Sequence, residues 1–187
     1  MARLSDLPMK AFSALVGFVA LSAGGLAINA GAAVTFKIAA IIAFINDGVF
    51  KSKGITAAIP FTAGHKAVPL GGYVCLFVVG LDAAGAVTTY QASRVFLPEV
   101  QDDGTTKYRG FDFYLNAAGV PVAAKMPQLE DFNSSFLPDV PHGITPVGII
   151  KITANSANFV PGTSALDLAG TVPAYFDISV LPGATNL

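Results

Sequence analysis

Residues 137–167 read LPDVPHGITPVGIIKITANSANFVPGTSALD, and this segment sets the expectation for the whole chain. Its centre, residues 147–153, is dense in β-branched side chains, which fit a pleated sheet better than a helix. Prolines surround that centre, and each one fixes φ and removes a backbone hydrogen-bond donor. They are Pro138, Pro141, Pro146 and Pro161. The pattern therefore predicts one strand of limited length, entered and left through extended loops.

Alternation along this strand would place mainly apolar side chains on both of its faces. One set is Val147, Ile149 and Lys151, and the other is Gly148, Ile150 and Ile152. We therefore expect the strand to be covered on both sides. Each fully buried Val or Ile would contribute roughly 1.5–3 kcal/mol, a large share of the net stability of a small domain.

A turn pattern recurs on either side of this segment. Residues 73–91 predict a hairpin around Asp82-Ala83-Ala84-Gly85, in which Asp accepts backbone N–H bonds and Gly tolerates a positive φ. The same order of Leu, Asp or Asn, any residue, Ala and Gly returns at residues 115–119 and 166–170. Its spacing is irregular, so it predicts three hairpin turns of one kind and no solenoid repeat.

The first third of the chain predicts further strands. Residues 26–53 carry turn signals at Asn29-Ala30-Gly31 and Asn46-Asp47-Gly48, and a hairpin is expected there. Residues 38–45 could instead form a short helix, because periodicity does not separate the two structures in so short an apolar run. Residues 54–72 predict a loop with room for an edge strand.

The remaining segments are predicted from local patterns. Residues 99–109 are the most polar and predict a surface loop with Asp103-Gly104 at its tip, and residues 121–141 predict a long irregular connection. Residues 111–116 alternate, which predicts a strand with Phe111 and Phe113 facing inward. We expect a turn at residues 159–163 and a last strand at residues 175–181.

Composition places these strands in a protein with little charge. The chain has 187 residues, of which 53% are hydrophobic and 12% are charged, and its mean hydropathy is +0.61. An average soluble domain has roughly 25% charged residues. We expect an all-β fold, an antiparallel β-sandwich or jelly-roll-like domain over residues 26–187 with an extended N-terminal arm over residues 1–25. Such a surface suits a homo-oligomer, a trimer or dimer, that buries much of its exterior.

The arm contains an uncharged run at residues 11–23 that imitates part of a secretory signal. It is shorter than the roughly 20 residues that span a bilayer, yet a membrane-anchored or exported protein stays open as an alternative. We favour an arm or first strand that the subunit or a neighbour covers. The candidate residues for a subunit or capsid interface are Phe12, Leu15, Val16, Phe18, Val19 and Leu21.

Residues that could carry chemistry do not form a catalytic pattern. Asp102 and Asp103 are adjacent, which favours a surface turn, and the two histidines, His65 and His142, are far apart in the sequence. Cys75 lies in an apolar run and is expected to be a buried, inert thiol. Basic residues are scattered, which argues against direct nucleic-acid binding. We therefore expect no enzyme activity, no cofactor and no metal site.

Two sets of segments resemble a group of small virion structural proteins of tailed bacteriophages. One set is residues 137–153, 158–167 and 168–182, and the other is residues 24–38, 45–53 and 81–91. The most specific motifs are Pro146-Val147-Gly148 and residues 159–163. The similarity spans roughly residues 24–182 and does not cover the apolar N-terminus.

The resemblance implies a non-enzymatic protein that is assembled in the host cytoplasm and carried in the virion. Its expected role is head decoration, also called cement, or a fibre-like component. The expected partners are the major capsid protein or other virion proteins, and no membrane is expected among them. A tail, baseplate or host-binding fibre component remains the alternative within this class.

Overall fold

A computed structural model describes residues 17–31, 33–100, 106–123 and 138–179. These residues contain strands and no helix, and every pairing between strands is antiparallel, so the predicted all-β fold class is confirmed. In chain order the strands are β1 (Phe18–Ala20), β2 (Leu26–Ile28), β3 (Phe36–Ile38), β4 (Ile42–Asn46), β5 (Val49–Lys53), β6 (Thr56–Ile59), β7 (Tyr73–Leu81), β8 (Val87–Gln91), β9 (Arg94–Val100), β10 (Thr106–Leu115), β11 (Pro121–Ala123), β12 (Thr145–Ala154) and β13 (Thr171–Asp177).

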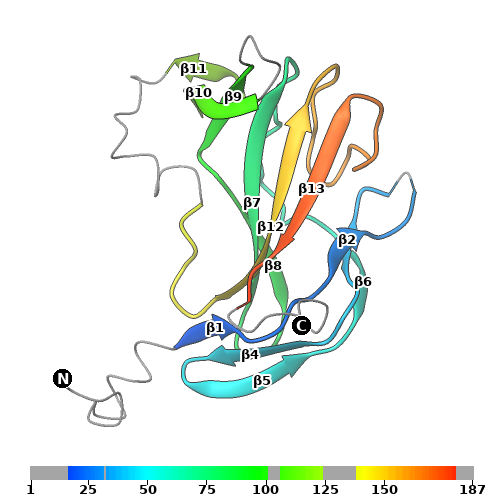
Figure 1. The fold of residues 1–187 in the computed structure, drawn as a ribbon, viewed down its shortest axis with the longest axis vertical. Coiled ribbons are helices and arrows are strands. Elements are labelled where there is room, and N and C mark those ends of the chain that lie inside the picture. Colours follow the sequence, from blue (N-terminus) through cyan, green and yellow to red (C-terminus); the bar gives the residue numbers. More distant parts are fainter. Residues whose placement is uncertain (1–16, 32, 101–105, 124–137, 180–187) are drawn as a thin grey trace, which may run out of the picture.

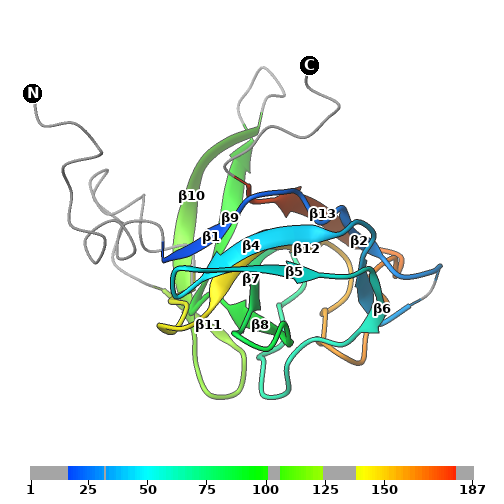
Figure 2. The same cartoon turned by 90° about the horizontal axis from the view of Figure 1, so that it is seen from below.

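The strands form one large sheet and two small ones. The large sheet has the order β11-β10-β9-β7-β12-β13, with β8 also paired to β7, and the small sheets are β1-β4-β5 and β2-β3-β6. In Figure 1, β7, β12 and β13 run upright while β4 and β5 cross the lower end of the molecule. Figure 2 looks onto that lower end, where β1, β4 and β5 lie in front of β7 and β12. The arrangement is consistent with a β-sandwich-like fold.

Strand β12 lies between β7 and β13 and contains the predicted strand 147–153. Its side toward the interior is fully covered, since Ile150, Ile152 and Ala154 have no exposed surface, whereas Ile149 and Lys151 on the opposite side are only half-buried. The expectation of full cover on both faces is therefore wrong. The second face belongs to the outside of the large sheet.

One residue of β12 departs from the predicted alternation. Val147 is completely buried, although simple alternation groups it with the half-buried Ile149. The pairing with β7 shifts between Pro146 and Gly148, so β12 has one extra residue at this point. Such a β-bulge changes the direction of the inserted side chain, and the alternation that predicts faces does not hold across it.

The core packs against the inner side of the large sheet and is closed by β3, β4 and two loops. The ring of Phe61 belongs to this core and meets three other phenylalanine rings edge-on, with centroid distances of 5.6 Å to Phe36, 5.1 Å to Phe77 and 5.8 Å to Phe159. Edge-to-face geometry is the arrangement that aromatic quadrupoles prefer. Val68 and Phe159 exchange backbone hydrogen bonds of 2.8 and 2.9 Å, which ties the two loops together.

Two of the three predicted hairpin turns are confirmed, with the same hydrogen bonds in each. Asp82 Oδ1 accepts the N–H of Ala84 and of Ala86 at 2.8 Å, and Asn116 Oδ1 accepts the N–H of Ala118 at 2.9 Å and of Val120 at 3.0 Å. Gly85 and Gly119 have positive φ angles of 79° and 74°. These turns join β7 to β8 and β10 to β11.

The third turn is wrong as a hairpin. Gly170 has the expected positive φ of 87°. However, residues 166–170 end a long connection between β12 and β13 instead of directly joining paired strands. The turn therefore has the predicted backbone conformation at its glycine, but the sequence pattern does not predict the length of the connection between β12 and β13.

Several predicted element bounds also move. Residues 38–45 are not a helix, because β3 ends at Ile38 and β4 begins at Ile42, and the room for an edge strand in residues 54–72 is filled by β6. The predicted last strand at 175–181 is instead β13, which starts and ends four residues earlier.

The polar segment 99–109 is mostly strand, since β9 reaches Val100 and β10 begins at Thr106. The expected loop tip, Asp103-Gly104, lies outside the described residues. The predicted strand 111–116 is confirmed within β10, but the directions of Phe111 and Phe113 are not described. Residues 121–123, expected to be irregular, form β11, and the predicted turn at 159–163 is confirmed by the hydrogen bond from the Thr163 N–H to the Val160 oxygen (3.0 Å).

The described part of the predicted arm, residues 17–25, lies against the same chain. β1 pairs with β4, and the Asp177 carboxylate accepts the N–H groups of Gly24, Gly25 and Leu26 at 3.1, 3.2 and 3.3 Å. Three backbone donors on one carboxylate fix the path of the chain between β1 and β2. These contacts join the N-terminal segment to the end of β13.

Gly148 allows β12 and β13 to pack closely, which gives a first prediction. A Cβ at this position would lie 2.8 Å from the Phe176 carbonyl oxygen and would overlap Leu26 Cδ1. We expect Gly148→Ala to lower the free energy of unfolding by about 1–3 kcal/mol, the usual cost of overpacking, as measured by denaturant unfolding.

The matched control is Gly54→Ala, because nothing lies within 4 Å of a Cβ placed there. Its effect should stay within about 0.5 kcal/mol, as for other surface substitutions. Equal unfolding midpoints for Gly148→Ala and the unaltered protein would contradict the close approach at β12.

Candidate functional site

The most distinctive surface of the described residues is apolar and lies on the outer faces of two sheets. Large hydrophobic side chains that are exposed include Ile41, Val49, Phe50, Ile55, Leu70, Val120, Val122, Val160, Leu168, Val172, Phe176 and Ile178. Single exposed hydrophobic residues are common in soluble proteins. Contiguous groups of them are the informative case, because they mark interaction sites. The register of the strands shows which of these residues are neighbours.

The outer face of the β1-β4-β5 sheet is the first such group. Val19, Ile45 and Phe50 lie directly opposite one another on β1, β4 and β5. Their alternating neighbours on β4, Ile42 and Phe44, are fully buried, so this row points away from the core. We define the small-sheet face as Val19, Leu21, Ile41, Ala43, Ile45, Phe50 and Ser52.

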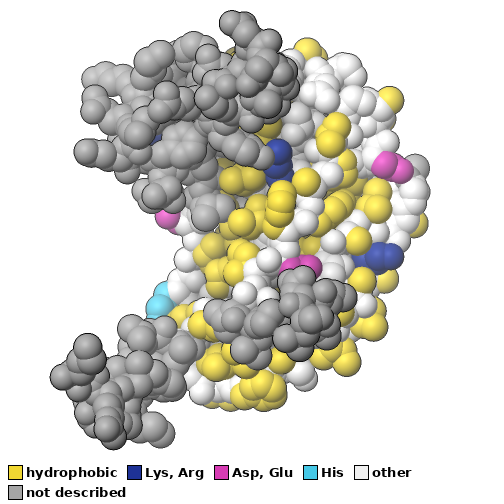
Figure 3. Space-filling model, in the orientation of Figure 1, with side chains coloured by type: hydrophobic (Ala, Val, Ile, Leu, Met, Phe, Trp, Pro, Cys, Tyr) yellow, Lys and Arg dark blue, Asp and Glu magenta, His cyan; other side chains and the backbone are white. Residues whose placement is uncertain are grey.

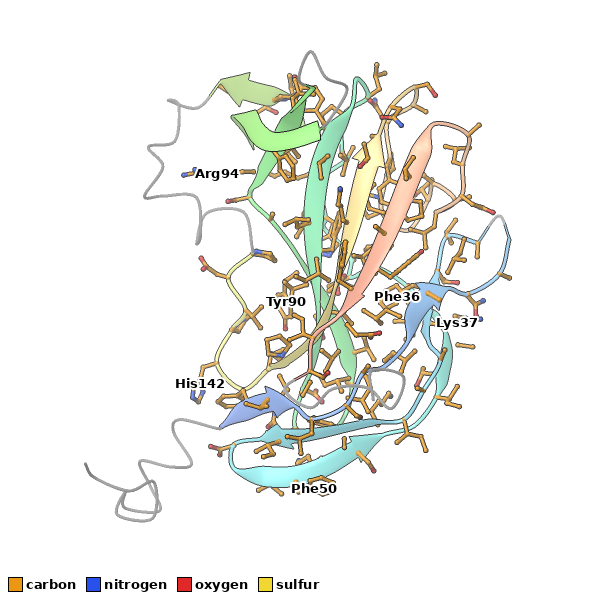
Figure 4. All side chains as sticks on the ribbon, viewed as in Figure 1. Phe36, Lys37, Phe50, Tyr90, Arg94 and His142 are labelled. Atoms are coloured by element: carbon orange, nitrogen blue, oxygen red, sulfur yellow. The ribbon has the colours of Figure 1, made fainter. Side chains whose placement is uncertain are left out.

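No charged side chain belongs to the small-sheet face as defined. Phe50 is 67% exposed and Ile41 is 64% exposed, and the other apolar members are half-buried. Figure 4 shows Phe50 at the lower edge of the molecule, on the strand farthest from the core. The face therefore offers apolar area to a partner without first removing water from an ion.

The hairpin that carries this face is built by a tight turn and fixed by a buried polar joint. Asp47 and Gly48 both have positive φ, 51° and 72°, as a two-residue turn between antiparallel strands requires. Asn46 Nδ2 donates to the Gly143 carbonyl oxygen at 2.8 Å and to Thr145 Oγ1 at 3.2 Å. Thr145 Oγ1 in turn donates to the Ile45 carbonyl oxygen at 2.9 Å. This joint holds β4 against the start of β12.

The six predicted interface residues separate into three groups. Phe12, Leu15 and Val16 lie outside the described residues. Phe18 is on the inner side of β1, where its ring meets the His142 ring edge-on at 4.9 Å. Val19 and Leu21 belong to the small-sheet face, where the Leu21 N–H donates to the Ala43 oxygen at 2.8 Å. Whether a partner contacts any of them stays a prediction.

Sequence reasoning missed Ile41, Ile45 and Phe50, which make up much of this face. The signal was available in the alternation of residues 41–53 around the Asp47-Gly48 turn. Because side chains alternate between faces, a two-residue turn pairs Ile45 with Phe50. The exposed side was not assigned, since both alternating sets of β4 are apolar.

The outer face of the large sheet is the second apolar group. It consists of three rows that cross β7, β12 and β13: Val78–Ile149–Phe176, Leu76–Lys151–Ala174 and Val74–Thr153–Val172. Exposure is confined mainly to β13, where Val172 is 53% and Phe176 is 51% exposed, whereas Val74 and Val78 on β7 are buried. Figure 3 views this side and shows hydrophobic side chains along the middle of the molecule. We call these nine residues the large-sheet face.

A groove of about 450 Å³ lies between the loop at residues 62–66 and the residues from Thr88 to Ser93, and Asp139 also lines it. Thr62 and Thr89 each accept the other's backbone N–H at 2.9 Å. Gln91 Oε1 accepts the Lys66 N–H at 2.6 Å, and Gln91 Nε2 donates to the Lys66 oxygen at 2.8 Å. These side chains attach the loop to the edge of β8.

His65 belongs to this attachment. Its Nε2 lies 2.8 Å from Thr89 Oγ1, and its ring meets the Phe77 ring edge-on at 5.4 Å. Burial lowers the pKa of His65 below its ordinary value of 6.5, and a hydrogen bond with Thr89 acts in the opposite direction. Within residues 17–31, 33–100, 106–123 and 138–179, no group of three or more His, Cys, Asp or Glu could hold a metal ion.

The other candidates for chemistry are dispersed. His142 is exposed at the lower left of Figure 4, far from the groove, and Asp102 and Asp103 lie outside the described residues. Cys75 is fully buried as predicted, and burial raises the pKa of its thiol to about 12. Gln91 Nε2 lies 3.6 Å from its sulfur. Of the described candidates, His142 and Cys75 lie apart from each other, one exposed and one buried.

His65 should make stability depend on pH. The folded protein disfavours protonated His65, so the unfolded chain takes up the proton first as the pH falls. The contribution of His65 is therefore complete above its unfolded pKa of 6.5 and declines as the pH falls through the lower pKa of the folded state.

We expect His65→Gln to reduce this decline in a series of melting temperatures between about pH 8 and pH 5, the range in which histidine titrates. In the control His142→Gln, the melting temperature should fall with decreasing pH as steeply as in the unaltered protein, because His65 is still present. An unchanged slope in His65→Gln would show that the decline has another source.

Cys75 should resist thiol reagents in the folded protein. At about pH 8 a free thiol is partly ionised, whereas the buried Cys75, with a pKa of about 12, is protonated and inaccessible. We expect a thiol reagent to label Cys75 only when the protein unfolds. Mass spectrometry measures the fraction of labelled protein. A Ser93→Cys variant provides an exposed thiol as the positive control, and rapid labelling of native Cys75 would contradict its burial.

Comparison of the chain with protein-family models, with curated proteins and with solved structures finds no significant match. Among the described residues, no helix is long and apolar enough to cross a membrane. The apolar faces and the resemblance in the sequence are therefore the features that bear on function.

Proposed function

We propose that this chain is a virion structural protein of a tailed bacteriophage that decorates the head shell and stabilises it. The observation that carries the proposal is the presence of exposed apolar side chains on the outer faces of two different sheets of one subunit, Phe50 and Ile41 on one and Phe176 and Val172 on the other. They point in different directions, since one closes the lower end of the molecule and the other covers the front of the large sheet (Figures 1 and 2). One subunit can therefore contact a shell and a neighbouring copy together.

The mechanism of such a protein is adhesion. Each Å² of apolar surface that contact removes from water contributes roughly 25 cal/mol, and this area must be exposed again before the shell can open. The low charge of the chain supports the same role, because few ions must lose their water when the surface is covered. In this proposal the chain acts without enzyme activity, a cofactor or a membrane.

We assign shell binding to the large-sheet face. Its outer rim on β13 is the exposed part, with Phe176 and Val172 both about half exposed. Lys151 is the one charged residue among the nine that define this face, so little charge must lose its water when the face is covered. The major capsid protein is the proposed partner, and the virion is the proposed location.

Addition of the purified protein to shells that lack it tests this proposal. We expect saturable binding and a higher temperature of shell disruption, and we expect Phe176→Glu to weaken binding at least about tenfold, because a buried unpaired charge is costly. The matched control is Val122→Glu, an exposed apolar residue on β11 outside both faces.

Failure of the unaltered protein to bind shells would overturn the proposal. Binding to isolated tails or baseplates instead would favour the tail or fibre component, which shares the same kind of apolar surface. Location of the subunit in an image of the particle distinguishes these two outcomes directly.

A further inference from the structure

We infer that the small-sheet face is the surface through which two copies of this chain associate, packed face to face across a two-fold axis. The chemistry of the face identifies the partner. Among the residues that define it, Ser52 is the single polar one, and no acid or base is present. Unrelated partners are usually selected and oriented by complementary charges, which this face does not provide.

A second copy is the partner that fits a charge-free face. In a two-fold contact the same patch occurs on both sides, so any charge in it would meet a like charge near the axis. The small-sheet face avoids this repulsion completely. The whole chain has a net charge of −1 at pH 7, so long-range repulsion between copies is also weak.

The edge of this sheet is protected, which directs association to its face. β5 is the outer strand of the β1-β4-β5 sheet, and its side chains at Lys51 and Lys53 lie on the inner side opposite Phe44 and Ile42. Lys51 Nζ donates to the carbonyl oxygen of Ala83 in the β7–β8 turn. Pairing two β5 strands edge to edge would bring the lysines of both copies together, and such inward charges oppose edge pairing.

The size of the face predicts a weak contact. Three strands spaced about 4.8 Å apart and about five residues long cover roughly 250 Å², whereas stable complexes bury about 800 Å² on each partner. Dilute protein should therefore associate reversibly. Here the inference rests on the proposed function, because copies held side by side on a shell reach effective concentrations of about 1 mM.

A charge-swap experiment tests the inference. Phe50 and Ile41 are the most exposed apolar members of the face, so replacing them leaves the core intact. One double variant carries Phe50→Glu and Ile41→Glu, and the other carries Phe50→Lys and Ile41→Lys. Analytical ultracentrifugation over a concentration series measures self-association of each variant alone and of an equal mixture, and thermal unfolding checks that both variants fold.

We expect the unaltered protein to associate with increasing concentration, each double variant alone to associate at least about tenfold more weakly because like charges oppose each other, and the mixture to recover association. Only a surface that contacts its own copy gives recovery on mixing. Phe176→Glu, on the large-sheet face, should leave self-association unchanged.

Three outcomes would overturn the inference. They are an unaltered protein that is monomeric up to about 1 mM, the effective concentration of neighbouring copies, association that neither double variant weakens, and weakening without recovery on mixing. If the double variants instead lose shell binding while the unaltered protein stays monomeric, this face binds the shell. Self-association that passes the charge-swap test in a protein that binds no shell supports the inference and contradicts the proposed function alone.

Discussion

Strand β12 is held along both edges, by β7 on one side and by β13 on the other, and the remaining sheets depend on this arrangement. Its inner face supplies Ile150 and Ile152 to the core, and Gly148 leaves space for Leu26. At its first residue, Thr145 joins the buried hydrogen bonds that position β4. A single central strand thus fixes the large sheet, the core and the sheet that closes the lower end.

Much of this fold is predictable from local sequence because the responsible interactions are local. β-branched residues with flanking prolines predict β12, and Asp82 or Asn116 with a glycine three residues later predicts a hairpin, since each side chain bonds within its own turn. The third turn shows the limit. Gly170 has the same backbone conformation. However, β13 pairs with β12 across the connection at residues 155–170, and the interactions within the turn do not determine the length of that connection.

Faces were harder to predict than strands. A strand with apolar residues on both sides, such as β12 or β4, does not state which side meets the core, because that depends on what packs against it. The bulge at Val147 changes the direction of its side chain, which strict alternation along a strand does not predict. For the candidate surface, Val19 and Leu21 were predicted from the uncharged N-terminal run, while Phe50 and Ile41 required the register of the β4–β5 hairpin.

The edges of the sheets oppose contact with other chains, whereas the outer faces do not, and this difference supports the proposal of a subunit that assembles. β13 carries Pro173, which has no N–H to offer a further strand, and β5 carries two lysines on its inner side. Both edges thereby resist uncontrolled strand addition. The faces carry no comparable barrier, because the small-sheet face lacks charge and the large-sheet face has Lys151 alone among its nine residues. A chain that only needed to stay monomeric would gain solubility from charges on these faces, so their apolar character is best explained by surfaces that are meant to be covered.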